Sequence, residues 1–219
     1  EPTSVPLDDR MAHAAAYNDY NVIYVGSGGL DAAGAAVEGK QIVARVAGMV
    51  AAVPSRQSLT HRPVPGLVKP LEMLTNAKYE KAINSGMLAF STSSAGTVWI
   101  EQGITTLVNP SGEDDAGWKK IKRAKIRFEL MNRCSDTVEP LIGQINNNTD
   151  GRANIISIIQ GQVLDRMVNE GKLEAGAQII VDPNNAPQGD SAWFVITADD
   201  TDSMEKIYLN FQFRFSAAV

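Results

Sequence analysis

Apolar side chains recur at every third or fourth position in several segments, which is the spacing of a helix that buries one face. The sequence predicts a first helix that Asp8 and Asp9 can cap and that runs to about Tyr17. A second helix is expected from 35 to 53, before Pro54. Its apolar positions at helical spacing are Val43, Val46, Ala47 and Val50. A third helix is expected between Thr75, a good N-cap residue, and Gly86, a C-terminal stop.

Short β-branched runs between these helices predict strands. Residues 21–25 form one such run, which ends at the loop Gly26-Ser27-Gly28-Gly29. Residues 87–90 and 97–102 are expected to form a hairpin across the turn-rich Ser93-Ser94-Ala95-Gly96. Helices and strands therefore alternate in the first half of the chain, as in an α/β fold.

A Pro, Gly and acid-rich stretch, 109–117, divides the chain by composition into two expected domains, 1–110 and 111–219. Beyond it, residues 124–130 fit a strand period, but the helical period continues to 145 and favours a helix that Pro140 bends or ends. A further helix is expected from Asp150 to Gly171, followed by strands at 177–181 and 192–197. Runs of helices followed by runs of strands indicate an α+β domain.

The last predicted strand shows the strongest alternation in the sequence. Its odd positions are apolar while most of its even positions are polar: Ile207, Leu209, Phe211, Phe213 and Phe215. Each large apolar side chain contributes roughly 1.5–3 kcal/mol when buried, so this face requires a cover. The cover is either the strand's own domain, the ordinary case for a terminal strand, or the sheet edge of a neighbouring subunit. The residue pattern alone leaves both alternatives open.

The net charge and the cysteine content of the chain argue against some classes of function. The chain has 219 residues, 44% of them hydrophobic, and a formal net charge of -5, which gives no general attraction to nucleic acid or to anionic membranes. The one cysteine, Cys134, forms no internal disulfide and is expected to be a buried core residue. Because the chain begins at Glu1 with a loop-like segment, we expect it to be the C-terminal portion of a longer protein.

The sequence contains few of the motifs that are typical of catalytic or phosphate-binding sites. The glycine loop 26–29 follows a strand, where a phosphate would bind, but it lacks both G-x-G-x-x-G and a Walker lysine. A phosphate-binding α/β enzyme is therefore a remote alternative. His13 and His61 have no metal-ligand companion at useful spacing, and no serine lies in a G-x-S-x-G elbow. We expect no enzyme activity, no cofactor and no metal.

Two charged runs remain. The acidic run Glu113-Asp114-Asp115 lacks the ligand spacing of a calcium loop and is expected to be solvated. A basic stretch follows it: Lys119, Lys120, Lys122, Arg123, Lys125 and Arg127. With few aromatic residues nearby, this stretch fits an acidic protein surface better than nucleic acid, and a plain solvated face is an equal alternative.

Several segments in a fixed order resemble phage tail sheath proteins. In the first half these are Ala44-Arg45-Val46-Ala47-Gly48-Met49, Ser58-Leu59-Thr60, Pro63-Val64-Pro65-Gly66, Leu74-Thr75-Asn76 and Gln102-Gly103-Ile104-Thr105-Thr106-Leu107. In the second half they are Ile142-Gly143, Asn146-Asn147-Asn148, Asp150-Gly151-Arg152 and Asp202-Ser203-Met204-Glu205-Lys206-Ile207-Tyr208. No single segment is diagnostic, so the resemblance rests on their order and spacing over nearly the whole chain.

The resemblance implies a subtilisin-like α/β domain without a catalytic triad, then a smaller α+β C-terminal sheath domain that ends in an extended strand. It implies a structural subunit that polymerises with copies of itself around a tail tube, meets a baseplate and contracts during DNA delivery. Such a subunit belongs to the tail of a virion and assembles in the host cytoplasm. Sheaths of pyocin or type VI-like injection machines share this architecture and are the nearest alternative.

In that family, terminal arms donate strands to the sheets of neighbouring subunits. The resemblance therefore places Ile207, Leu209, Phe211, Phe213 and Phe215 at an inter-subunit sheet. It also makes the basic residues of the second domain a possible contact with the tube protein: Lys119, Lys120, Lys122 and Arg123.

Overall fold

The fold combines helices with short strands in a computed structural model, which describes residues 1–112 and 115–213. The α-helices are α1 (Leu7–Tyr17), α2 (Lys40–Ala52), α3 (Asn76–Asn84), α4 (Ile121–Val138), α5 (Thr149–Ile159) and α6 (Asp165–Asn169). The strands are β1 (Tyr24–Val25), β2 (Gly29–Leu30), β3 (Ala36–Val37), β4 (Lys69–Pro70), β5 (Met87–Leu88), β6 (Phe90–Thr92), β7 (Val98–Ile100), β8 (Gln178–Val181) and β9 (Phe194–Thr197). Short 3-10 turns at Ala116–Lys119 and Glu139–Leu141 flank α4, and a π-helical stretch, Gln160–Leu164, joins α5 to α6.

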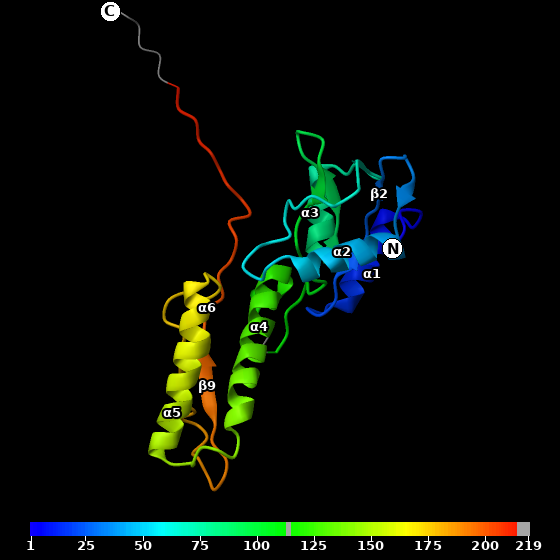
Figure 1. The fold of residues 1–219 in the computed structure, drawn as a ribbon. Helices are drawn as coiled ribbons and strands as arrows, with labels where there is room; N and C mark the ends of the chain where they lie inside the picture. The colour runs from blue at the N-terminus through cyan, green and yellow to red at the C-terminus, as the bar shows by residue number, and fades with distance from the viewer. Residues whose placement is uncertain (113–114, 214–219) are drawn as a thin grey trace, which may run out of the picture.

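The N-terminal part of the chain is built from short strand pairs between helices. β1 and β5 pair in parallel, β2 lies between β3 and β4 in antiparallel pairing, and β6 and β7 form a hairpin. The expected turn at 93–96 is present, but Met87 and Leu88 pair with β1 instead of joining the hairpin. α1, α2 and α3 pack around these strands as one mass (Figure 1).

Three helix starts differ from the sequence expectation. α2 begins at Lys40, since residues 36–37 pair as β3, and its buried side chains are Ile42, Val46 and Met49. α5 is capped by Asn148, whose side chain accepts the Gly151 N–H, and not by Asp150. Likewise Asp8 and Asp9 lie in the first turn of α1, where their charge favours the helix N-terminus, but they are not its cap.

The sequence from 124 to 145 fits both a strand period and a helical period, and the structure shows a helix, α4, over most of this region. It runs to Val138 and passes into the 3-10 turn that contains Pro140, as the proline requires. The C-terminal stop at Gly171 is also confirmed. Gly171 has φ +68, and the Lys172 N–H donates to Met167 O at 2.9 Å, which is a Schellman ending.

α4 connects two hydrophobic cores. Ile121 at its start belongs to a core with α2 and β5 to β7, where Val46, Leu88, Phe90 and Ile100 are buried. Ile126, one and a half turns later, belongs to a second core formed with α5, α6, β8 and β9. Figure 1 shows α4 running from the first mass along the helices and β9 of the second. A third, smaller core joins α1 to α3 through Met11, Tyr79 and Met87.

Among the described residues, no helix has both the length and the apolar character that crossing a bilayer requires.

Candidate assembly site at the C-terminal arm

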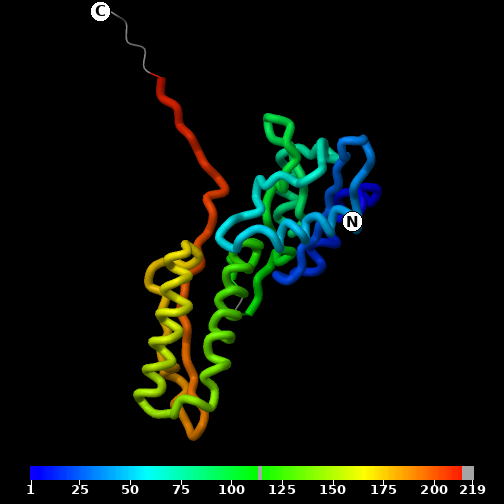
Figure 2. Tube along the Cα trace, viewed as in Figure 1, coloured from blue at the N-terminus to red at the C-terminus, as the bar shows by residue number. Residues whose placement is uncertain are grey.

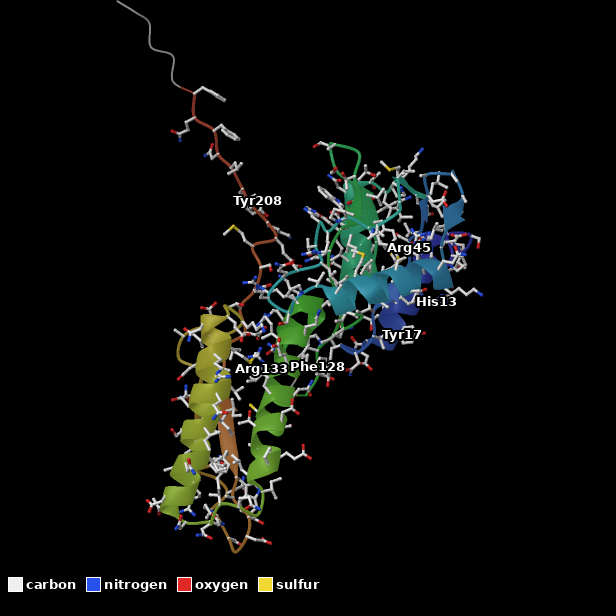
Figure 3. The ribbon with its side chains drawn as sticks, in the orientation of Figure 1. His13, Tyr17, Arg45, Phe128, Arg133 and Tyr208 are labelled. Atoms are coloured by element: carbon white, nitrogen blue, oxygen red, sulfur yellow. The ribbon has the colours of Figure 1, made fainter. Side chains whose placement is uncertain are left out.

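The described chain ends in an exposed apolar segment, residues 206–213, which we call the arm. It has no regular secondary structure, and no backbone hydrogen bond joins it to the rest of the described chain. Ile207 is 67% exposed, Leu209 71%, Phe211 71% and Phe213 94%. Figure 2 shows the arm leaving between the two masses and extending away from both, and Tyr208 marks it in Figure 3. Phe215, also predicted to lie in this strand, is outside the described residues.

The segment before the arm, residues 199–205, is firmly held, and we call it the root. The Asp200 carboxylate receives four hydrogen bonds from two guanidinium groups of α4, those of Arg123 and Arg127, at 2.5–3.1 Å. One residue later, the Thr201 N–H donates to Lys172 O at 2.9 Å, and its hydroxyl donates to Gly171 O at 2.9 Å. The root is thus tied to both α4 and the turn after α6.

Glu205 ties the end of the root to the N-terminal mass. Its carboxylate accepts from the Ser58 hydroxyl at 2.8 Å, the Thr60 hydroxyl at 3.0 Å and the Gln102 amide at 3.1 Å. The Lys120 ammonium lies 3.3 Å away, and the Glu205 side chain is 8% exposed. A carboxylate is costly to bury unless it is fully hydrogen-bonded, and here three donors and a cation surround it.

The charged groups of the root and of the residues that bind it shift one another's pKa values. Burial alone would raise the pKa of the Asp200 carboxyl, but the hydrogen bonds from Arg123 and Arg127 outweigh it and lower the pKa. The same balance lowers the pKa of Asp202, through its hydrogen bond with Lys120. Burial by itself lowers the pKa of Lys120, and its two carboxylate partners more than reverse this. The root is therefore an ionised cluster at neutral pH.

The basic residues expected at a tube contact make their contacts within the chain. Lys119 Nζ donates to Val108 O at 2.6 Å, Lys120 pairs with Asp202 at 2.7 Å, and Arg123 pairs with Asp200 at 2.5 Å. Lys122 is 5% exposed, and its burial lowers its pKa. α4 thus uses much of this basic stretch to hold the root, a role that sequence reasoning missed. The acidic residues just before the arm were the available signal, because they complement the stretch in charge.

Neighbouring side chains occupy the space around the glycine loop. Residues 26–29 are buried, and an added Cβ at Gly26 would meet the Met87 side chain, at Gly28 that of Leu71 and at Gly29 that of Leu67. The Gly26 N–H donates to Leu88 O, and the Gly26 carbonyl accepts from the fully buried Arg10. The glycines allow this close approach, which leaves no cradle for a phosphate at the loop.

The other candidate side chains have structural partners. His13 pairs with Glu1 at 3.0 Å, and the His61 ring stacks on Trp99 with centroids 4.3 Å apart. Asp115 pairs with Arg127 at 3.0 Å, while Glu113 and Asp114 lie outside the described residues. Cys134 is half-buried beside the second core, and burial raises the pKa of its thiol. Within residues 1–112 and 115–213, no group of three or more His, Cys, Asp or Glu side chains is arranged to hold a metal ion.

A second exposed apolar surface lies on the β8–β9 sheet. These strands pair with each other alone in the described structure, so both sheet edges are open. Their inner side chains pack on α5 and the π-helical stretch, whereas the outward pair Ile180 and Val195 is 45% and 37% exposed. An open edge beside apolar side chains is a template for a further strand.

Comparison with known proteins finds one family that the N-terminal mass resembles in sequence. Residues 4–106 match the model of the phage tail sheath protein central domain. The N-terminal mass is therefore similar to a phage tail sheath central domain, over 103 of the 219 residues of the chain. No curated protein sequence matches it significantly.

Solved sheath structures extend the likeness beyond the central domain. The sheath tail protein of Desulfitobacterium hafniense superposes with a TM-score of 0.70 at 20% identity, covering 85% of this chain and 47% of that one. The sheath tail protein of Listeria innocua gives 0.65 at 20% identity, with 84% and 47% covered. The contracted PVC sheath complex of an extracellular contractile injection system gives 0.73 at 13% identity, with 97% and 62% covered. These likenesses show the fold, and the chain described here spans about half the length of the first two relatives.

Proposed function

We propose that this protein is a structural subunit of a contractile sheath and that the arm links one copy to the next. The observation that supports this proposal most directly is that the arm exposes four large apolar side chains, while the root before it is tightly held. Leaving such a face in water forgoes roughly 1.5–3 kcal/mol per side chain, which a partner surface would recover.

The chemistry of the arm fits strand addition. Its N–H and C=O groups have no partner in the described chain, and its side chains alternate between apolar and mostly polar. The β8–β9 sheet of a second copy offers open edges and an exposed Ile180–Val195 pair. Main-chain pairing with alternate side chains in apolar contact is the general mode by which an extended segment joins a sheet.

The finer fold assignment belongs to the same proposal. We propose that residues 1–110 are a portion of a subtilisin-like domain and residues 111–219 a C-terminal sheath domain. The separate cores on either side of α4 support this division, although Ile121 of α4 belongs to the first of them. The packed glycine loop and the stacked His61 support a structural and not a catalytic role.

The partners follow from a sheath role: copies of the chain in rings or a helical lattice, a tail tube protein and a baseplate, in the tail of a virion after assembly in a host cytoplasm. A tube contact through Lys119, Lys120, Lys122 and Arg123 stays a prediction, and it would have to compete with the contacts that Lys119, Lys120 and Arg123 make within the chain. A related injection machine is the second candidate, supported by the likeness to the PVC sheath complex.

Removal of residues 207–219 from the full-length protein tests the proposal. It keeps the Glu205 anchor, so the folded body should retain its thermal unfolding midpoint, while sheath formation judged by electron microscopy should be lost. A matched control replaces Tyr208, Asn210 and Gln212 by Ser, which spares the apolar face and should leave sheaths intact. Normal sheaths from the truncated protein would contradict the linking role of the arm.

A further inference from the structure

Inward and outward side chains alternate along the root from Thr201, and apolar and mostly polar residues alternate along the arm. Thr201, Ser203 and Glu205 are half-buried, whereas Asp202 and Met204 between them are exposed. From Thr201 onward the odd-numbered residues of the root thus face the body, as the inward side chains of an extended chain do. The odd-numbered residues of the arm are apolar. The face that contacts polar groups up to Glu205 therefore continues, two residues later, as the apolar face of the arm.

The root itself determines that odd-numbered residues face inward, because β9 has the opposite pattern. In the segment from Phe194 to Asp200 the even-numbered residues point inward, and at Thr201 the pattern changes to odd. Two fixed points produce the change. The arginines of α4 hold the Asp200 side chain, and the turn after α6 holds both the Thr201 N–H and its hydroxyl. Four residues on, Glu205 lies on the same face as Thr201 and is fixed in turn.

We propose that Glu205 is a positioning residue that sets the register of the arm, so that the odd face is presented at a fixed depth to the neighbouring copy. The proposal rests on the linking role of the arm argued above. In an extended chain, a slip of one residue exchanges the two faces. Without a fixed root, the arm would present either Ile207, Leu209 and Phe211 or the largely polar face of Tyr208, Asn210 and Gln212.

The chemistry of the anchor fits this role. An apolar anchor accepts any similar side chain, but the carboxylate of Glu205 matches a set of three donors and one cation. Those donors come from two loops, with Ser58 and Thr60 on one and Gln102 on the other, and Lys120 stands at the start of α4. Met204 and Lys206, the residues that a slip of one would bring to this place, supply no carboxylate for those donors: Met204 has only a weakly accepting thioether and Lys206 has no side-chain acceptor.

A first test measures arm fixation in the isolated chain, without assembly. Trypsin cleaves after Lys206, and the bond enters a protease only when the flanking residues leave the body. Glu205→Ala should raise the rate of this cleavage roughly tenfold or more, because the carboxylate holds several charge-assisted hydrogen bonds. Glu80→Ala is the control, since this exposed carboxylate lines the pocket that also contains Thr60, Gln102 and Glu205 but makes no side-chain hydrogen bond in the described structure. Equal cleavage rates in the two variants would overturn the proposal.

A second test uses insertions between Lys206 and Ile207 in the full-length protein. One inserted Ser exchanges the faces and should abolish sheaths, whereas two inserted Ser residues restore the faces and should preserve assembly at least in part. Adding Glu205→Ala to the one-residue insertion should recover sheaths, since a released root can slip back. If one and two insertions assemble alike, or if Glu205→Ala recovers nothing, register control by Glu205 is refuted. Loss of the linking role itself would appear separately, as normal sheaths from the protein that lacks 207–219.

Discussion

Asp200 is the carboxylate that binds the root to two arginines of α4, and Asp200→Asn tests its contribution to stability. The side chain is 5% exposed and receives hydrogen bonds from Arg123 and Arg127, whose side chains are 26% and 15% exposed. The amide keeps the shape of the carboxylate. It removes the negative charge, however, and turns an N–H₂ group toward guanidinium donors.

The expected cost follows from these contacts. Hydrogen bonds to charged groups contribute about 1.5–3 kcal/mol each, and breaking a buried ion pair costs about 3–5 kcal/mol. Partial exposure of both arginines reduces the second figure, so we expect a loss of about 2–4 kcal/mol in the free energy of unfolding. With a urea slope of about 2 kcal/mol per M, the unfolding midpoint should fall by about 1–2 M.

The assay is urea unfolding followed by circular dichroism, at several pH values. The folded pKa of Asp200 lies below its ordinary value of 3.8. Its contribution is therefore complete above pH 3.8 and is lost as the pH falls through the folded pKa. The difference between wild type and Asp200→Asn should be constant from pH 5 to 8 and shrink in strong acid. Asp136→Asn, an exposed site on α4, is the control. If Asp200→Asn costs no more than this control, the ion-pair account of the root is wrong.

Three further predictions concern the body of the protein. Arg10→Leu should lower the free energy of unfolding by about 3–5 kcal/mol in thermal or urea unfolding, because it leaves the Gly26 carbonyl and Glu72 without their buried partner; an effect under 1 kcal/mol would contradict this. Gly26→Ala should cost about 1–3 kcal/mol by overpacking against Met87, and Met87→Ala should relieve that specific clash in a double-mutant cycle; strict additivity would refute it. The Glu170 carboxyl should titrate near a pKa of about 2, because Arg133 and Lys172 hydrogen-bond to it, so its stabilising effect is complete above its ordinary 4.5 and is lost toward pH 2; an NMR titration midpoint near 4.5 would contradict the pairing.

Elements whose signals are local in sequence were predictable. Capping and stop residues located α1 and α3, and periodic apolar positions located α4. The residues Pro140 and Gly171 marked helix ends that the structure confirms. Their evidence lies within one or two turns of the helix itself. The first five residues of the expected second helix differ because Val37 pairs with Gly29, a contact that the local pattern does not contain.

The candidate site was predictable in part. The alternation of Ile207, Leu209, Phe211 and Phe213 was visible in the sequence, and their exposure is a property of the folded chain. The anchor was not visible, since Glu205 meets Ser58 and Thr60 across more than 140 residues. For the same reason the basic residues of α4 looked free. Their carboxylate partners lie about 80 residues downstream and were read as part of a different element.

Hydrogen exchange of the arm in assembled sheaths tests the central claim most directly. The account predicts that the amides of residues 207–213 exchange freely in the isolated chain and are protected by about a hundredfold or more in the sheath, because they join a sheet of the neighbouring copy. Amides of the anchored root should be protected in both states. Free exchange of residues 207–213 in the assembled sheath would contradict the proposed link.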